Sequence, residues 1–399
     1  MVHLHILSLE ACRSGGAGAY TAELIRQLAA RGQRIDLICH KADPSLGTIC
    51  EIHRLPMPRA SRLPWAWRLA PILRQREYDR FIRALALQEP DVVIGSAQQM
   101  FPEHWRRFPR APLIYVPHSL VAPLEVQGMP WISPLQRWAA VRVFRSLERE
   151  ALARASRTVR FTRTGCDTLN LYYGKSIKSR FTVLPTPVPI PELTPRDRPS
   201  DAIKLLFVGR LVESKNVAWL LGCLGRLLDL PWTCDIVGDG EERQRLEEIT
   251  RQSKLPDRII FHGQQDDVGR FYRQADLLVF PSRLENSPLV LLEAMSYGVP
   301  SLSIRADGRQ YINANHEIVT ADHDGFLADH QEDFVNKLRT LLQSPELLRD
   351  VGNRARQTVE KRNRWDHHLE GYERIFEQVQ RRIAEGNRKL DNKDQHIPA

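Results

Sequence analysis

Two series of short apolar segments alternate with helical segments along this chain, and this alternation limits the folds open to it. The first series has strand-length apolar segments at residues 2–9, 35–39, 91–95 and 113–116. The second has them at residues 204–208, 234–237, 259–261, 277–280 and 301–304. Strands that alternate with helices form parallel sheets covered by helices on both faces. The sequence therefore predicts an α/β protein with two similar halves.

A proline-rich stretch, residues 185–200, separates the two series and contains six prolines. Proline is excluded from helix interiors and central strands, so this stretch is expected to be an interdomain linker. A chain of 399 residues also exceeds the size at which a single core usually splits. We predict an N-terminal domain over residues 1–190 and a C-terminal domain over residues 200–364.

The last part of the chain predicts one long helix followed by a polar tail. Apolar residues recur at a spacing of three to four over residues 365–382, which gives such a helix one buried face. Residues 386–399 are polar and are expected to fray.

The amino-acid composition indicates which classes of protein this chain can belong to. A hydrophobic content of 42% with 26% charged residues is typical of a folded globular chain. No apolar run approaches the roughly 18 residues of a membrane span, and the first strand lacks a basic leader, so a cytoplasmic location is expected. The six cysteines form no C-x-x-C pair, which argues against a cysteine zinc site and a disulfide framework.

Positive charge is concentrated in the first half. Residues 1–190 hold 27 Lys and Arg against 14 Asp and Glu, whereas the remainder holds 30 against 34. A basic half favours an acidic partner, either an anionic membrane or a phosphorylated acceptor, and nucleic acid is not expected because no recognition motif is present. Residues 59–69 and 131–145 combine Trp with Arg, which suits a lipid headgroup layer, although ordinary amphipathic packing is the alternative.

A short helix is predicted over residues 288–297. Ser287 is a favourable N-cap residue, Pro288 suits the first helical position, and Gly298 with Pro300 ends the helix. Its amino end would present unpaired amides and the positive end of the helix dipole, where parallel α/β sheets bind phosphorylated ligands. A diphosphate is the expected ligand.

Two acidic residues bracket this predicted anion site. Glu285 precedes the helix, and Glu293 lies inside it, about 7–8 Å along the axis at ~1.5 Å per residue. A nucleotide-sugar has hydroxyl-bearing rings on both sides of its pyrophosphate, and such hydroxyls donate to carboxylates. The alternative is that Glu293 faces solvent and Glu285 only begins a turn.

Two cations are expected at the same sheet edge. Gly209 and Arg210 follow the first strand of the second half, and Lys215 comes five residues later. Fixed cations there would complement two phosphates and the charge that develops on a leaving nucleotide diphosphate. The alternative is that both are solvated surface residues.

The order of these motifs resembles the retaining GT-B glycosyltransferases of family 4. The resemblance spans the chain and is carried by F-V-G-R-L…K (207–215), V-G-D-G (237–240), F-x-G (261–263), Y-x-x-A-D-L-x-V-x-P-S (272–282), E-x7-E (285–293), G-V-P (298–300) and D-G-F-L (324–327). It implies two Rossmann-like domains facing a cleft, with the acceptor on the first and the nucleotide-sugar on the second. It also implies that the last helix returns to the first domain.

The resemblance implies roles for individual residues. Arg210 and Lys215 would hold the diphosphate, Glu293 the ribose, and Glu285 the transferred sugar. The catalytic residues would be His118, Arg210, Lys215 and Glu285. The donor-binding residues would be Gly15, Gly16, Gly209, Arg210, Lys215, Glu285, Asn286, Ser287, Pro288, Leu289 and Glu293.

The first half contributes a glycine-rich loop and a histidine. The loop with Gly15 and Gly16 lets backbone approach a ligand closely. A dinucleotide fingerprint is disfavoured because Thr21 stands where a third glycine is needed and no acid ends the second strand. His118 follows a strand end, and the resemblance implies contact with the donor sugar, whereas a lone histidine is more often structural.

The expected reaction transfers a sugar with retention at the anomeric carbon, and a UDP-sugar is the favoured donor. No D-x-D motif is obviously placed to hold a metal, although residues 266–267 and 322–324 are superficial candidates, so no metal or cofactor is predicted. An epimerase on the same fold, an enzyme for a small soluble acceptor and a non-catalytic sugar-nucleotide or membrane-binding module are the alternatives. The run Asn286-Ser287-Pro288, where the family commonly has Gly-Phe-Gly, leaves the identity of the sugar open.

Overall fold

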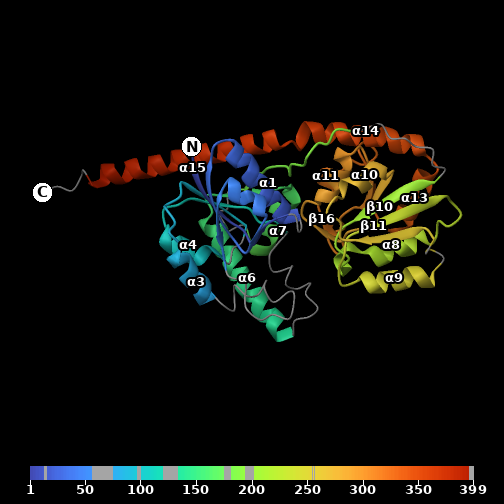
Figure 1. Cartoon of the computed structure of the whole chain (residues 1–399), viewed down its shortest axis with the longest axis horizontal. Helices are drawn as coiled ribbons and strands as arrows, with labels where there is room; N and C mark the ends of the chain where they lie inside the picture. Colours follow the sequence, from blue (N-terminus) through green and yellow to red (C-terminus); the bar gives the residue numbers. More distant parts are fainter. Residues whose placement is uncertain are drawn as a thin grey trace. The chain divides into compact units, whose positions relative to one another are not determined.

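The structure is a computed structural model, and it describes residues 1–12, 16–55, 75–96, 100–119, 134–174, 181–193, 202–253, 255 and 257–394. The chain divides into two compact units. Unit 1 consists of residues 1–160, 165–184 and 369–399, and unit 2 consists of residues 161–164 and 185–368. Figure 1 shows both as sheets flanked by helices.

Unit 1 is built on a parallel sheet whose strand order is β5-β3-β1-β6-β7-β8-β9. Its strands are β1 (His3–Leu7), β3 (Arg34–Cys39), β5 (Glu51–Arg54), β6 (Val92–Gly95), β7 (Leu113–Tyr115), β8 (Arg157–Arg160) and β9 (Phe181–Val183). A small parallel pair, β2 (Glu10–Ala11) and β4 (Lys41–Ala42), extends it. Its helices are α1 (Gly16–Ala30), α3 (Gln75–Ala84), α4 (Phe101–Arg107), α6 (Pro134–Arg154) and α7 (Arg163–Tyr173), the first two residues of α7 being grouped with unit 2.

Unit 2 is built on a second parallel sheet, with the order β12-β11-β10-β13-β15-β17. Its strands are β10 (Ile203–Val208), β11 (Trp232–Val237), β12 (Ile259–Gly263), β13 (Leu277–Phe280), β15 (Ser301–Ile304) and β17 (Phe326–Ala328). A parallel pair, β14 (Leu284–Glu285) with β16 (Ile312–Asn313), stands beside it. Its helices are α8 (Val217–Leu224), α9 (Arg243–Gln252), α10 (Gly269–Gln274), α11 (Leu289–Ser296), α12 (Asn315–Ile318), α13 (Gln331–Leu342) and α14 (Pro345–Arg362).

Several inner strands of the two sheets are buried along their whole length. Every residue of β6, β13 and β15 is buried. Because helices cover both faces of a parallel sheet, such strands become continuous apolar runs, which is why they stand out in the sequence. The predicted α/β architecture is confirmed, and each predicted strand is present to within two residues at either end.

Two of the sequence-based boundaries need correction. The short helix begins at Leu289 with Pro288 in extended backbone as its N-cap residue, so Ser287 is not the cap. The final helix α15 (Trp365–Asp394) continues well past residue 382, into the stretch expected to fray. Residues 185–193 have no helix or strand, as proline predicts, and residues 194–200 lie outside the described part.

Helix α15 belongs to both units, because its first four residues are grouped with unit 2 and the rest with unit 1. Its apolar face in unit 1 is buried and consists of Leu369, Tyr372, Ile375, Phe376 and Val379. The hydroxyls of Tyr372 and of Tyr20 on α1 are hydrogen-bonded at 3.0 Å, and both side chains are buried. This part of α15 therefore packs inside unit 1.

Tyr372→Phe tests this packing. The change removes the hydrogen bond to Tyr20 and keeps the ring, so the free energy of unfolding should fall by about 1 kcal/mol. Urea unfolding followed by circular dichroism measures it. Tyr172→Phe is the control, because Tyr172 lies on α7 and is partly exposed, and no change is expected there. Equal midpoints for wild type and Tyr372→Phe would contradict the assignment.

His368, in the first turn of α15, makes unit 2 sensitive to acid. A ring N–H of His368 donates to the carbonyl of Pro185 at 3.0 Å, and burial lowers the pKa of the ring to about 4. Between pH 6.5 and pH 4 the histidine is protonated in the unfolded chain and stays neutral in the folded protein. The folded protein therefore becomes less stable as pH falls through this window. The free energy of unfolding decreases there by about 1.4 kcal/mol per pH unit.

His368→Gln keeps an N–H donor and removes the titrating group. We expect the wild type to lose stability more steeply than the variant between pH 6.5 and pH 4, and the two curves to run parallel above pH 7. Chemical unfolding at a series of pH values checks this. Parallel curves over the whole range would show that this ring is not held neutral by burial.

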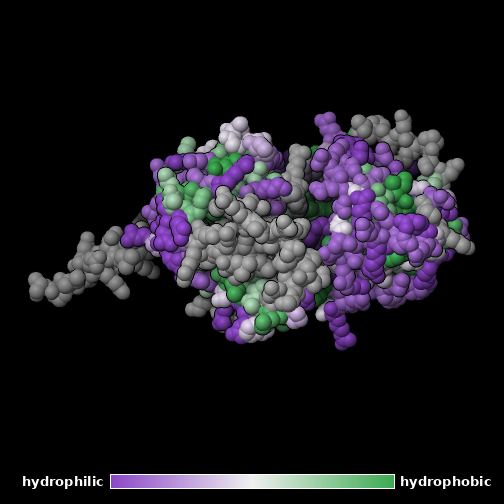
Figure 2. Space-filling model, turned by 60° about the horizontal axis from the view of Figure 1, so that its bottom comes forward, coloured by the Kyte–Doolittle hydropathy of each residue, from purple (hydrophilic) through white to green (hydrophobic). Residues whose placement is uncertain are grey.

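No described helix is both long enough and apolar enough to span a bilayer. The face of unit 2 visible in Figure 2 is mostly hydrophilic, in keeping with a core confined to the interior of the sheet and its helices.

Candidate functional site

The loops after β10, β11 and β12 are joined through their backbones at the carboxyl edge of the unit 2 sheet. The Gly209 amide donates to the Val237 carbonyl at 3.0 Å, and the Gly238 amide donates to the Gly263 carbonyl at 2.9 Å. Gly238 has a φ of +134°, and a Cβ there would lie 1.9 Å from the Gly209 carbonyl oxygen. Only glycine permits this approach, so the glycines of these motifs shape the edge that follows β10.

Lys215 is placed by a 3₁₀ turn (Glu213–Lys215) that is fixed to the chain after β13. The Arg283 amide donates to the Ser214 carbonyl at 2.8 Å. Asn216 then takes a left-handed conformation, with φ of 61°, and its side-chain amide donates to the Tyr311 hydroxyl at 3.2 Å. Asparagine is one of the few residues that adopt this conformation readily. The turn therefore directs Lys215 toward the segment that carries Glu285.

Glu285 lies on β14, where pairing with Asn313 of β16 fixes its position. The Lys215 Nζ donates to the Glu285 carboxylate, and both side chains are mostly shielded, at 16% and 11% exposure. The Lys215 Nζ also lies 5.8 Å from the centre of the Phe280 ring. The sequence placed these two residues at the same sheet edge, and the structure brings them into direct contact.

Arg210 stands at the end of β10 and is exposed. Its guanidinium makes no hydrogen bond or ion pair with any residue in the described part of unit 2. An unpaired guanidinium offers several N–H donors to a phosphate. Arg210 is thus available to an external anion, whereas Lys215 is already held beside a carboxylate.

Helix α11 begins directly after this segment. The Ser287 hydroxyl is hydrogen-bonded to the Thr186 hydroxyl at 2.7 Å, and the backbone carbonyl of Asn286 accepts from the Thr162 hydroxyl at 3.0 Å. These contacts hold the turn so that α11 starts at Leu289, with no side chain capping it. The first amides of a helix have no intrahelical acceptor, so they face outward from this end as anion donors.

Glu293 lies one turn into α11 and is partly buried. The Tyr272 hydroxyl donates to one of its carboxylate oxygens at 2.9 Å. Burial raises the pKa of the Glu293 carboxyl, and the hydrogen bond from Tyr272 opposes this rise. Tyr272 therefore orients Glu293, a function that sequence reasoning missed although the tyrosine opens one of the motifs.

In unit 1, Gly15 lies outside the described residues and Gly16 is the first residue of α1. His118 follows β7, and its ring lies edge to face with Tyr20, with centroids 5.2 Å apart. Burial, together with the nearby charge of Arg160, lowers the pKa of His118 to about 4. The ring is therefore neutral near pH 7 and suited to hydrogen bonding.

The acidic residues 322–324 have a structural explanation. Asp322 takes a φ of 62° in a tight turn, and the buried Asp324 carboxylate accepts from the Thr320 amide at 2.7 Å and from the Thr358 hydroxyl at 3.0 Å. Asp324 thus closes the turn before β17.

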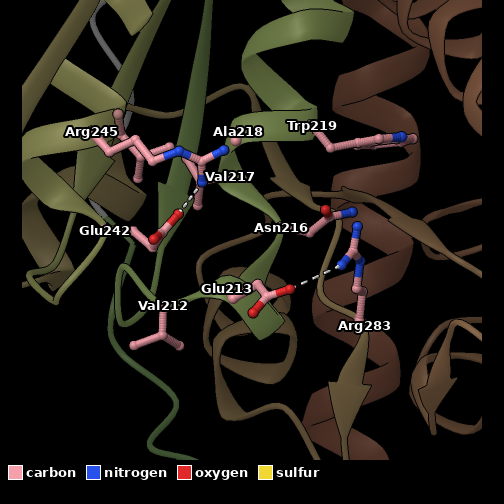
Figure 3. Close-up of a pocket in the computed structure, with 10 residues that line it drawn as sticks. Val212, Glu213, Asn216, Val217, Ala218, Trp219, Glu242, Arg245 and Arg283 are labelled. Carbon is pink, nitrogen blue, oxygen red and sulfur yellow. Dashed lines mark hydrogen bonds and ion pairs between the residues drawn. The ribbon is translucent and has the colours of Figure 1, made fainter. Parts of the chain in front are cut away.

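A pocket of about 190 Å³ lies next to the Lys215 turn and is lined by Val212, Glu213, Asn216, Trp219, Arg245 and Arg283, among others (Figure 3). Figure 3 shows Arg283 pointing toward Glu213, with an ion-pair distance of 3.9 Å. Arg210, Lys215, Glu285 and Glu293 are not among its lining residues. The residues predicted to hold the donor therefore lie outside this pocket.

Family profiles match both halves of the chain. Residues 194–358 match the profile described as "Glycosyl transferases group 1", and residues 14–190 match "Glycosyltransferase Family 4". Among curated relatives, the chain is 32% identical over 148 residues to N-acetyl-alpha-D-glucosaminyl L-malate synthase of Bacillus anthracis, covering 37% of each chain. It is 32% identical over 169 residues to the lipopolysaccharide core biosynthesis glycosyltransferase LpsE of Rhizobium meliloti, covering 41% of this chain and 49% of the relative. The matches thus span less than half of these relatives' length.

Solved structures share the fold along nearly the whole chain. Sucrose-phosphate synthase from Thermosynechococcus elongatus superposes with a TM-score of 0.77 at 20% identity, covering 95% of this chain and 99% of that one. WaaG, a glycosyltransferase involved in lipopolysaccharide biosynthesis, gives a TM-score of 0.71 at 18% identity, covering 92% and 98%. With both halves matched by family profiles and the fold shared throughout, the chain belongs to the GT-B glycosyltransferases.

Proposed function

We propose that this protein transfers a sugar from a nucleotide-sugar, with a UDP-sugar favoured, to a hydroxyl acceptor, with retention of configuration at the anomeric carbon. The observation that carries the proposal is the contact between Lys215 and Glu285 beside the amino end of α11. Solved relatives of the same fold support the donor class, because the Anabaena protein HepE has been crystallised with UDP-glucose.

In the proposed reaction, Arg210, Lys215 and the first amides of α11 hold the diphosphate. The bond between the anomeric carbon and the β-phosphate oxygen breaks, and a bond to the acceptor oxygen forms on the same face. The acceptor proton passes to the leaving phosphate oxygen, so the protein needs no strong base. The cations stabilise the negative charge that grows on the leaving group, which is where preorganised charge is most effective.

The two carboxylates bind hydroxyls on either side of the diphosphate. Glu293 would accept from the ribose, and its free oxygen suits this because Tyr272 holds only the other one. Glu285 would accept from the transferred sugar, with Lys215 shared between the carboxylate and the phosphate. His118 would bind the sugar as a neutral ring, since its pKa lies near 4.

We place the acceptor among cell-surface polysaccharides or glycolipids. Relatives with segments of 28–34% identity include glycosyltransferases for lipopolysaccharide core and for an undecaprenol-linked saccharide. The excess of basic residues in the first 190 positions suits a phosphorylated or lipid-linked acceptor over a neutral soluble one.

A donor screen followed by product analysis tests the proposal. Thermal shift against UDP-, GDP- and ADP-sugars should show stabilisation by a UDP-sugar, because a ligand stabilises according to its concentration relative to its dissociation constant. NMR of the reaction with acceptor should then show an α-linked product from an α-linked donor. Conversion of the donor alone into an epimer would favour an epimerase, and binding without turnover would favour a non-catalytic module.

We also propose that the reaction needs no metal ion. Activity should persist in EDTA. Loss of activity in EDTA that Mg²⁺ or Mn²⁺ restores would contradict this.

We further propose that α6 contacts an anionic membrane. Leu135 and Trp138 are 74% and 58% exposed, and the Arg142 guanidinium lies 4.8 Å from the centre of the Trp138 ring. Trp and Arg together suit the headgroup layer. Residues 59–69 and 131–133 of the predicted interfacial stretches lie outside the described part. In a flotation assay with anionic liposomes, Trp138→Ala should bind more weakly than the wild type. If the wild-type protein does not bind the liposomes, the proposal is wrong.

A further inference from the structure

A cluster of histidines surrounds one buried carboxylate in unit 1. Asp36 lies in the middle of β3 and is 5% exposed at its side chain. One of its oxygens, Oδ2, lies 2.5 Å from Nε2 of His3 and 3.7 Å from Nε2 of His5, both on β1. The other oxygen, Oδ1, lies 2.8 Å from Nε2 of His53 on β5. The two strands on either side of β3 therefore direct three imidazole nitrogens at the same carboxylate.

His5 carries the strongest indication that this cluster takes a ligand. Its side chain is fully buried, and its Nδ1 lies 2.9 Å from Nε2 of His104 on α4. Its Nε2 has no hydrogen-bond partner among the described residues and points toward Asp36. A buried ring nitrogen left unpartnered costs free energy, and a cation placed between it and the carboxylate removes that cost.

The other ring nitrogens are arranged as they are in metal sites. The Nδ1 of His3 lies 3.4 Å from the carbonyl oxygen of Glu89, and the Nδ1 of His5 faces His104. A histidine that binds a metal usually donates its second ring N–H to a carbonyl or another acceptor, which fixes the tautomer. Both rings can therefore offer an Nε2 lone pair on the side of Asp36.

We propose that unit 1 binds one divalent transition-metal ion of the zinc class through Nε2 of His3, Nε2 of His5 and Oδ2 of Asp36. These three ligand atoms all lie within 4.8 Å of one another. Tetrahedral zinc with bonds of about 2.0–2.1 Å needs ligand atoms roughly 3.3 Å apart. The contact between His5 and Asp36 is close to this value, and His3 would move outward by less than about 1 Å.

The surroundings of the three ligands favour this ion over Mg²⁺ or Ca²⁺. The two imidazoles are borderline donors that suit Zn²⁺, whereas Mg²⁺ and Ca²⁺ prefer oxygen ligands alone. His53 would hold the second oxygen of Asp36, and His104 would orient His5. Entry is possible from the side of His3 and His53, whose side chains are 12% and 11% exposed.

The position of the cluster indicates a structural function. Its three proposed ligands lie within the first three residues of β1 and β3, whereas Gly16 and His118 follow the carboxyl-terminal ends of their strands. An ion there would tie the edge strand β5 and helix α4 to the centre of the sheet. No cysteine takes part, and the third ligand, Asp36, lies on a different strand from His3 and His5, which is why sequence reasoning did not predict the site.

Metal binding by the untagged full-length chain tests the proposal. The chain is stripped with a chelator, titrated with Co²⁺ and followed by visible absorption, after which Zn²⁺ is added. We expect the absorption to saturate at one equivalent of Co²⁺, Zn²⁺ to displace it, and Mg²⁺ to have no effect. Mass spectrometry of the eluted metal should give about one Zn²⁺ per chain.

Two variants and a control locate the ion. His3→Gln removes a ligand that is partly exposed and should weaken Zn²⁺ binding by at least about 100-fold, whereas His104→Gln should weaken it about 10–100-fold. His367→Gln changes an exposed histidine of unit 2 and should bind as the wild type does. Wild-type protein that shows no cobalt spectrum, or His3→Gln that binds Zn²⁺ as tightly as the wild type, overturns the proposal. The Co²⁺ titration of the wild-type protein tests the proposal even if a variant does not fold.

Discussion

Replacement of Lys215 by alanine is expected to lower kcat/KM by about 10²–10³-fold, the loss seen when one preorganised donor to a developing negative charge is removed. In this protein the Lys215 ammonium is fixed by a turn bound to the chain after β13 and lies against Glu285 and the Phe280 ring. The loss should appear mainly in kcat, because the charge on the leaving diphosphate is greatest in the transition state.

Lys204→Ala is the matched control for this experiment. Lys204 lies on the same strand, β10, and pairs with Asp235 at 3.3 Å near the strand's amino end. We expect turnover of this variant to stay within about twofold of wild type, since Lys204 lies at the end of β10 opposite the candidate site. Thermal unfolding of each variant separates a catalytic loss from unfolding. Full turnover by Lys215→Ala would contradict the assignment of the site.

Gly238→Ala is expected to destabilise unit 2 by about 2–3 kcal/mol or more and to abolish donor binding. The residue needs a φ of +134°, and the added Cβ would meet the Gly209 carbonyl oxygen at 1.9 Å. Alanine in such a conformation is strained, and relief of the clash would force the loops after β10 and β11 apart. Because Arg210 follows Gly209 directly, the change should displace the guanidinium as well.

Gly222→Ala is the control for this experiment, because it is the same substitution and we expect it not to destabilise the protein. Gly222 lies inside α8, has ordinary helical backbone, and a Cβ there meets no atom within 4 Å. Alanine favours a helix over glycine by about 1 kcal/mol, so this variant should be as stable as wild type or more stable. Denaturant unfolding of both variants gives the comparison. Equal denaturation midpoints for Gly238→Ala and wild type would show that the close contact between Gly238 and Gly209 does not hold the loops together.

The central strands could be predicted from sequence because both of their faces are buried. The strand β13 is a four-residue apolar run. A short apolar run between two helical segments is best interpreted as a buried strand. The strand β5, with sequence Glu-Ile-His-Arg, has exposed ends and no apolar run, and only pairing with β3 makes it a strand. Edge strands of this kind depend on tertiary contacts that local sequence does not reveal.

The clustering of the candidate residues could be predicted from sequence, whereas their contacts could not. Arg210 and Lys215 come after β10, and Glu285 and Glu293 come after β13, so their presence at one sheet edge follows from topology. The direct pairing of Lys215 with Glu285 depends on the left-handed Asn216 and on a backbone bond from Arg283, residues far apart along the chain. The cap prediction for Ser287 was wrong because its hydroxyl is bonded to Thr186, about a hundred positions away.

A crystal structure of the protein with UDP tests the central claim most directly. We predict the diphosphate within hydrogen-bonding distance of the Arg210 guanidinium, the Lys215 ammonium and the first amides of α11, with the ribose at Glu293. A nucleotide bound elsewhere, for example in the pocket beside Trp219 and Arg245, with Lys215 still paired only to Glu285, would contradict it.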